Sequence, residues 1–215
     1  MKKALIIIIF ILLRYTGFAQ HPDRAIDDRI KHQVAALRKE SVDTICIYQE
    51  YCVGCEITWK NKSDQCDYEG YYISARLYWK KNGLSYMTAK DNCFDYSTAE
   101  IIADSLWGFY FRNMNEIRKD TIRSFQYTKI ENNTTKIYTS TIDHSLWQNI
   151  IMIVNGDIVE KQFNDYNFEK TADIAGHHLN INYEYNRNTS SKKLLLLLDS
   201  LTKALSKRKL ISRIK

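Results

Sequence analysis

The chain has 215 residues, a net charge of +6, 45% hydrophobic residues, one proline and seven glycines. This composition excludes a collagen-like repeat, a Pro/Gly-rich linker and an intrinsically disordered chain. The length suits a single domain with a substantial core. The charge is uneven, because the segment from Ser190 onward carries eight basic residues against Asp199 alone.

The N-terminus has the layout of a secretory signal peptide. Lys2 and Lys3 precede an apolar run over 4–13, and small residues follow before a predicted cleavage after Ala19. The run is shorter than the roughly 20 apolar residues that span a bilayer, which disfavours an uncleaved anchor. We therefore expect a signal peptide over 1–19 and one domain over 20–215, secreted or, in a bacterium, periplasmic, and not membrane-spanning after cleavage.

Apolar residues at helical spacing predict three helices. The first covers 23–39, and the third covers about 191–209. The second is predicted over about 98–119, because Ser97 and Glu100 have the spacing of a capping box. The apolar stripes of the three helices are Ile26, Ile30, Val34 and Leu37; Ile102, Leu106, Phe109 and Ile117; and Leu194, Leu197, Leu198, Leu201 and Leu205.

Strands are predicted where β-branched and aromatic residues cluster between turn signals. The predicted strands are 44–51, 56–60, the two arms around 81–83, 122–130, 135–142, 150–154, 158–163 and 179–186. In the last of these, apolar residues alternate with Asn180, Asn182 and Asn186, which predicts a half-buried strand with a wet asparagine face. Because no regular βαβ alternation occurs, we expect an α+β fold with a largely antiparallel sheet.

The clearest hairpin surrounds Asn82-Gly83. A two-residue turn would set Leu77 opposite Thr88 and so mix apolar with polar partners. A three-residue loop with Gly83 in the left-handed conformation would set Leu77 opposite Met87 instead. Since register must match one buried face, the three-residue loop is the prediction.

All five cysteines lie between residues 46 and 93. Outside the cytoplasm such thiols tend to pair, so we expect disulfides among Cys52, Cys55, Cys66 and Cys93, with one bridge from the Cys52/Cys55 region to Cys66 or Cys93. Cys46 lies in an apolar strand and is the candidate free thiol. A four-thiolate zinc module and a thiol–disulfide oxidoreductase using Cys52 and Cys55 are the alternatives. The oxidoreductase is disfavoured because the pair lies between strands and not at a helix N-terminus.

Other catalytic and metal motifs are missing from the sequence. The chain has no HExxH, no GxSxG and no glycine-rich phosphate loop. Asp143, His144 and Ser145 are neighbours and cannot converge as a triad, and His177 and His178 would point to opposite faces of a strand. We expect no catalytic residue, metal or cofactor, and a hydrolase using His144 or His177 is the enzymatic alternative.

Tyrosine is frequent, with 15 residues. Tyr72, Tyr78, Tyr86, Asn180 and Asn182 are candidates for a sheet face that binds sugar or peptide. The competing interpretation is ordinary cross-strand aromatic pairing.

The leucine stripe of the basic C-terminal helix favours packing against the sheet, with its lysines in water. We expect at most a weak attraction of this region to anionic surfaces, and no binding of nucleic acid. Together with the compartment, these features predict a secreted or periplasmic, disulfide-stabilised protein that acts as a non-catalytic binding or structural module for an unknown ligand or protein partner.

Overall fold

A computed structural model describes residues 24–55, 66, 68, 70–101, 105–173, 177–208 and 210–214. The predicted signal peptide over 1–19 and the predicted strand over 56–60 lie outside these residues. Among the described residues, no helix is long and apolar enough to cross a membrane.

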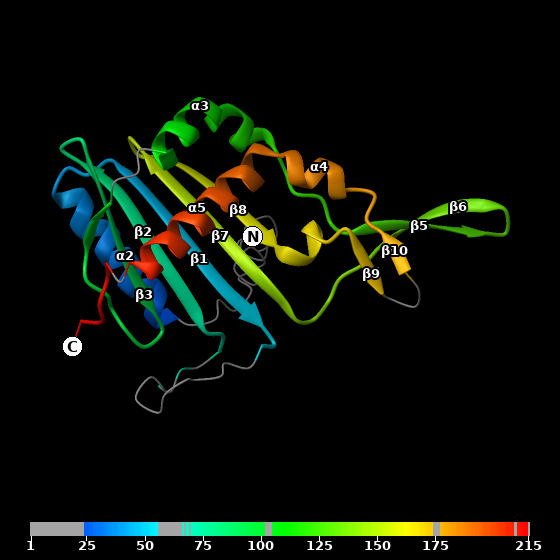
Figure 1. The fold of residues 1–215 in the computed structure, drawn as a ribbon, viewed down its shortest axis with the longest axis horizontal. Helices are drawn as coiled ribbons and strands as arrows, with labels where there is room; N and C mark the ends of the chain where they lie inside the picture. The colour runs from blue at the N-terminus through cyan, green and yellow to red at the C-terminus, as the bar shows by residue number, and fades with distance from the viewer. Residues whose placement is uncertain are drawn as a thin grey trace, which may run out of the picture.

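Six strands form one antiparallel sheet in the order β4-β3-β2-β1-β7-β8 (Figure 1). Their bounds are β1 Thr44–Val53, β2 Ile73–Lys81, β3 Leu84–Asp91, β4 Ala99–Ile101, β7 Ser145–Val154 and β8 Asp157–Asn164. With helices packed on this sheet, the predicted α+β class is confirmed.

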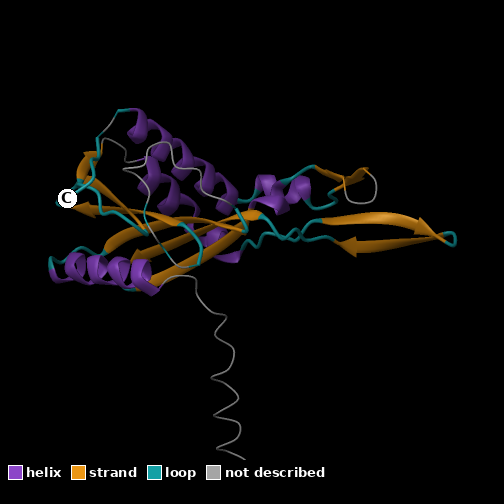
Figure 2. Cartoon of the chain, turned by 90° about the horizontal axis from the view of Figure 1, so that it is seen from below, coloured by secondary structure: helices purple, strands orange, loops and turns teal. Residues whose placement is uncertain are grey.

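Helices cover both faces of this sheet. Helix α2, Arg24–Lys39, lies on one face, and helices α3, Ser105–Lys119, and α5, Ser190–Lys207, lie on the other (Figure 2). Each face has its own apolar core: Ile45, Leu77 and Trp79 lie beneath α2, whereas Tyr78 and Met152 lie on the other face in one core with Leu198 of α5. The alternation of side chains along each strand therefore serves two cores.

The Asn82-Gly83 hairpin has the two-residue turn, and the predicted three-residue loop is wrong. Asn82 has φ +51° and Gly83 has φ +79°, as a type I′ turn requires. Leu77 lies opposite Thr88, and both are buried. The Thr88 hydroxyl donates to the Tyr96 carbonyl oxygen at 2.7 Å, which satisfies its polar group. The prediction failed because it assumed that only one face of the hairpin is buried.

Helix α3 begins at Ser105, and the predicted capping box at Ser97 is wrong. Residues Ala99–Ile101 instead form β4, which pairs with β3. Ser97 is occupied by the C-terminal segment, since its hydroxyl accepts from the Ser212 amide at 2.9 Å and its amide donates to the Ser212 carbonyl oxygen at 2.8 Å. A long-range pairing thus replaces the local helix start.

A second, smaller part of the structure extends from the end of the sheet. Strands β5 Gln126–Glu131 and β6 Thr134–Thr139 form a long two-stranded ribbon that projects away from the body (Figure 2). Its base is flanked by the 3-10 helix η2 Asp165–Phe168, strands β9 Thr171–Asp173 and β10 His177–Leu179, and helix α4 Tyr183–Asn188.

The predicted strand over 179–186 is wrong, and its polarity is inverted. The segment is the end of β10, a turn and α4. Asn180, Asn182 and Asn186 are buried, whereas Leu179 and Ile181 are exposed by 61% and 48%. The Asn186 side chain accepts from the Arg123 amide at 2.9 Å and donates to the Arg123 and Asn167 carbonyl oxygens. The asparagine side chains are buried because they form hydrogen bonds with backbone groups of loops, which have no partner in a sheet.

Candidate functional site

A broad hollow lies on the α2 face of the sheet. Helix α2 lies under only one end of that face (Figure 2), and beyond it a groove of about 580 Å³ crosses β2, β1, β7 and β8. This volume is typical of sites for small molecules, which measure about 300–1,000 Å³. The groove lies at the N-terminal end of α2, where Asp27 lines it, over the last residues of β1 and the first residues of β7.

Three aromatic rings stand in a row in this groove. The Tyr51 ring lies between Tyr71 and Trp147, with ring centroids 6.2 Å and 6.4 Å away and interplanar angles of 21° and 7°. Register explains the row, because Tyr51 on β1 pairs with Trp147 on β7, so both side chains stand on the same face. All three residues are partly buried, so part of each side chain meets solvent.

Side-chain amides lie beside the rings. The Gln162 amide donates to the Tyr51 hydroxyl at 3.0 Å, and the Asn149 amide donates to Glu160 Oε1 at 3.0 Å. Gln49 links this network to α2 through a 3.5 Å contact with Asp27 Oδ1. Asn149 Oδ1 is enclosed and has no hydrogen-bond partner among the described residues. Rings and amides together resemble a surface for a ligand with both apolar faces and hydroxyl groups.

The groove is acidic. Asp27, Asp143 and Glu160 line it, and none of the described lining residues is lysine or arginine. Carboxylates concentrated in a cleft repel anions and attract cations. The electrostatics therefore disfavour phosphates and acidic sugars as ligands.

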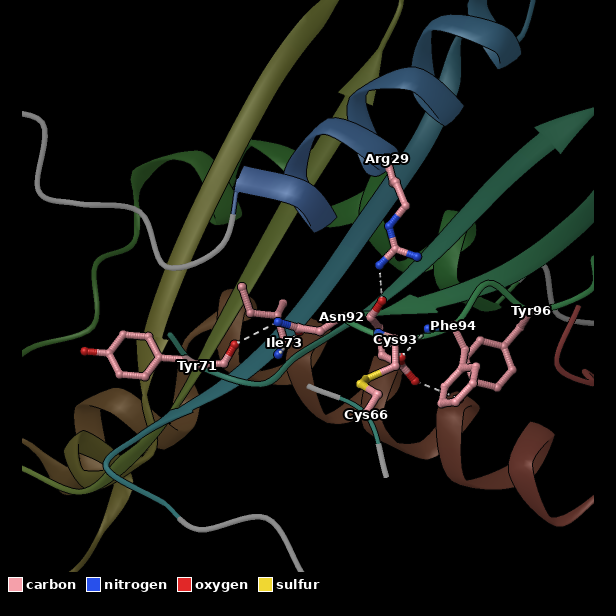
Figure 3. The surroundings of a disulfide bond; sticks show 9 residues. Arg29, Cys66, Tyr71, Ile73, Asn92, Cys93, Phe94 and Tyr96 are labelled. Atoms are coloured by element: carbon pink, nitrogen blue, oxygen red, sulfur yellow. Dashed lines mark hydrogen bonds between the residues drawn. A yellow bond between two sulfur atoms is a disulfide. The ribbon is translucent and has the colours of Figure 1, made fainter. Parts of the chain in front are cut away.

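The Cys66–Cys93 disulfide lies next to the contacts that hold Tyr71 (Figure 3). Asn92, beside Cys93, accepts from the Ile73 amide at 2.6 Å and donates to the Tyr71 carbonyl oxygen at 3.1 Å. Asp91 stabilises the same turn by accepting from the amides of Cys93 and Phe94. The end of β3 thus positions one ring of the groove.

The structure pairs Cys52 with Cys55 as well as Cys66 with Cys93. The expected bridge from the Cys52/Cys55 region to Cys66 or Cys93 is therefore wrong. Cys46 is a buried free thiol in the core beneath α5, and burial raises its pKa. No group of three or more His, Cys, Asp or Glu side chains among the described residues is arranged to hold a metal ion.

The five residues predicted as a binding face do not come together. Tyr78 is buried beneath α5, where its hydroxyl lies 3.0 Å from that of Thr202. Asn180 and Asn182 are buried at the base of the ribbon, where they bond backbone. Tyr86 stacks on Trp79 on the α2 face, and Tyr72 is partly buried at the start of β2.

The aromatic row of Tyr51, Tyr71 and Trp147 was missed in the sequence. Its signal is the alternation along β1 and β7, which becomes readable only when the register between two distant strands is known.

The histidine motifs are dispersed in the same way. His177 and His178 lie on β10, where the His178 ring stacks on Tyr127 at 4.1 Å. Ser145 opens β7, and its hydroxyl accepts from the Asn164 amide at 3.0 Å. His144 is exposed in the bend before β7, against the backbone of Gly54.

A second polar cluster lies beneath α5 and serves to attach that helix. The Tyr48 hydroxyl contacts Glu50, Asp199 and the Gln148 amide, and Arg76 pairs with Glu50 at 2.6 Å. Burial and the nearby carboxylates raise the pKa of Tyr48, which keeps its hydroxyl protonated. Because these groups satisfy one another, the open groove remains the better candidate for a site.

The chain matches no protein-family model, and comparisons with curated proteins and with solved structures also find no match.

Proposed function

We propose that the protein is an exported, disulfide-stabilised binding protein that holds a neutral or cationic saccharide in the groove of Tyr51, Tyr71 and Trp147. The row of three rings is the observation that carries this proposal. The C–H faces of a sugar ring pack well on aromatic surface, which combines large contact area with little conformational freedom to lose. Neighbouring side-chain amides suit hydroxyl groups, because they both donate and accept.

The charge of the groove narrows the ligand class. Asp27, Asp143 and Glu160 would repel a uronic acid or a phosphorylated sugar, and they would favour an amino sugar. The proposed location outside the cytoplasm is supported by the signal-peptide pattern over 1–19 and by the two disulfides, which persist in oxidising compartments.

The test is a glycan array containing neutral, amino and acidic oligosaccharides, probed with the oxidised mature chain. Titration calorimetry then follows with cellohexaose, a chitosan hexamer and an oligogalacturonate. We expect binding of the neutral or the cationic probe and none of the oligogalacturonate. Trp147→Ala should weaken binding at least about tenfold, since tenfold corresponds to about 1.4 kcal/mol and an aromatic hot spot contributes about 2 kcal/mol or more.

The matched control is Phe111→Ala, which removes an aromatic side chain that is 45% exposed on α3, on the opposite face. It should bind like the wild type. A Trp147→Phe variant keeps an aromatic ring and should retain part of the affinity. Binding only of acidic probes, or equal binding by Trp147→Ala and wild type, would reject the proposal.

A further inference from the structure

The Cys52–Cys55 disulfide adds little that the fold does not already have. It joins residues only three apart, whereas Cys66 and Cys93 are 27 apart. A disulfide restrains the unfolded chain less when the loop it closes is short. Strand β1 is moreover held by β7 up to this point, with Cys52 opposite Leu146 and Val53 opposite Ser145. The Cys52–Cys55 bridge is therefore poorly explained by a role in stabilising the fold.

The bridge is accessible. Gly54 and Cys55 are exposed, and Cys52 is partly buried. A cavity of about 240 Å³ opens beside it, lined by both cysteines together with His144, Asp165 and Glu169. A thiol from another molecule can therefore approach the disulfide without unfolding the sheet.

An imidazole lies directly against the bridged turn. A Cβ atom added to Gly54 would lie 1.9 Å from Nδ1 and 2.5 Å from Cε1 of His144. Gly54 also has φ +73°, which other residues rarely adopt. The turn therefore accepts the ring only because residue 54 is glycine. Reactive cysteine pairs need a nearby group that stabilises the leaving thiolate, and a histidine can serve where no helix N-terminus is present.

We propose that Cys52–Cys55 is a thiol–disulfide exchange site for proteins that carry a dithiol, with His144 as its proton donor and acceptor. This activity is separate from the binding proposed for the groove, which lies on the other face of β1 and β7. Cys55, the more exposed cysteine, is the point of attack, and Cys52 is the leaving group.

The exchange consists of two successive displacements at sulfur. A thiolate of the reduced substrate attacks Cys55 Sγ, the Cys52–Cys55 bond breaks, and Cys52 Sγ leaves with the electron pair and takes a proton from the His144 imidazolium. The second thiolate of the substrate attacks the substrate sulfur of the mixed disulfide, and Cys55 leaves as a thiolate. Two electrons have passed from the substrate dithiol, now a disulfide, to the cysteine pair. A second disulfide-bearing protein reverses these steps and restores the bridge.

The first measurement uses the oxidised full-length mature protein and a synthetic peptide dithiol at pH 7. Exchange is quenched by alkylation, and each cysteine is assigned by peptide mapping. We expect Cys52 and Cys55 to be alkylated first, while Cys66 and Cys93 stay bridged and the circular dichroism spectrum is unchanged. If Cys66 and Cys93 open first, or if all four open together with unfolding, the proposal fails.

The second measurement tests the histidine with a matched pair, His144→Gln and His32→Gln. His32 is an exposed histidine on α2, away from the disulfide. We expect His144→Gln to slow exchange about tenfold or more and to flatten its dependence on pH between about 6 and 8, because a general acid contributes about 10²–10⁴-fold. His32→Gln should match the wild type. Equal rates and equal pH profiles for the two variants would remove His144 from the mechanism and overturn the assignment.

Discussion

The Asn92 side chain binds the backbone of Tyr71, donating to its carbonyl oxygen at 3.1 Å while accepting from the Ile73 amide. Asn92 lies beside Cys93, whose disulfide reaches Cys66 in the segment before β2 (Figure 3). One side chain at the end of β3 therefore sets where the first ring of the groove stands.

Replacing Asn92 should lower both the free energy of unfolding and the affinity of the groove for a saccharide. Asn92→Ala removes two hydrogen bonds to backbone groups, so we expect the free energy of unfolding to fall by about 1–3 kcal/mol. Saccharide affinity should fall as well, because Tyr71 is no longer held. Urea unfolding and calorimetry measure the two effects. Asn113→Ala, which removes a bond to the Phe109 carbonyl oxygen on α3, is the control and should leave affinity unchanged.

Asn186 should be among the polar residues whose substitution lowers the free energy of unfolding most. Its side chain is fully buried and bonds three backbone groups of Arg123 and Asn167. Asn186→Ala removes the side-chain partner of both Arg123 backbone groups, while the Asn167 carbonyl oxygen keeps its bond from the Asn180 amide, and we expect a loss of about 3 kcal/mol in urea unfolding. Asn188→Ala, on the exposed end of the same helix, should cost less than about 1 kcal/mol. Similar losses for both variants would contradict the buried network.

Substitutions at two glycines distinguish the energetic cost of backbone strain from the cost of displacing the His144 ring. Gly54 and Gly83 have φ of +73° and +79°, but a Cβ at Gly83 would meet nothing within 4 Å. Gly83→Ala should therefore lower the free energy of unfolding only by the cost of holding alanine in the left-handed conformation, about 1–2 kcal/mol. Gly54→Ala must also displace the imidazole, so we expect a lower melting temperature than for Gly83→Ala and a shift of the His144 ring resonances. Equal melting temperatures would show that the His144 ring does not lie on Gly54.

Alkaline unfolding should depend on Tyr78. Burial raises the pKa of Tyr78 to about 12, above the value of about 10 in an unfolded chain. The unfolded state thus loses this proton first as pH rises. The stabilisation is fully present below pH 10 and is lost between about pH 10 and 12, about 3 kcal/mol in all.

The comparison that isolates this effect is Tyr78→Phe against Thr202→Val. Each variant removes the contact between the two hydroxyls, which costs about 1 kcal/mol at pH 8. Only Tyr78→Phe should show a shallower loss of stability from pH 9.5 to 11 in urea unfolding. The same slope in both variants would argue that Tyr78 ionises at its ordinary value when folded.

Elements with local signals were predictable. The stripe of Ile26, Ile30 and Leu37 marks α2, and Asn155-Gly156 marks the turn from β7 to β8, because spacing and turn chemistry act within a few residues. The capping box at Ser97 shows the limit of such signals. Its local preference was real, but pairing of Ser97 with Ser212 and of β4 with β3 is worth more than a helix start.

The groove could not be predicted from the sequence, because it depends on contacts between distant segments and sequence signals act within a few residues. Tyr51 lies on β1, Trp147 on β7 and Tyr71 in the bend before β2, and no local pattern in the sequence shows that these three segments meet. The asparagines of 180–186 were placed on the wrong side because polar residues usually face water, whereas here distant loops need hydrogen-bond partners.

The sequence by itself determined the α+β class, the approximate positions of the three principal helices and the places where the chain turns at Asn-Gly, since these follow from periodicity and backbone preferences that act over short distances. Only the tertiary structure decided the hairpin register, the disulfide pairing, the burial of the asparagines and the row of rings. Each of these depends on which distant segments meet, and that choice is made by the whole core and the hydrogen bonds it encloses.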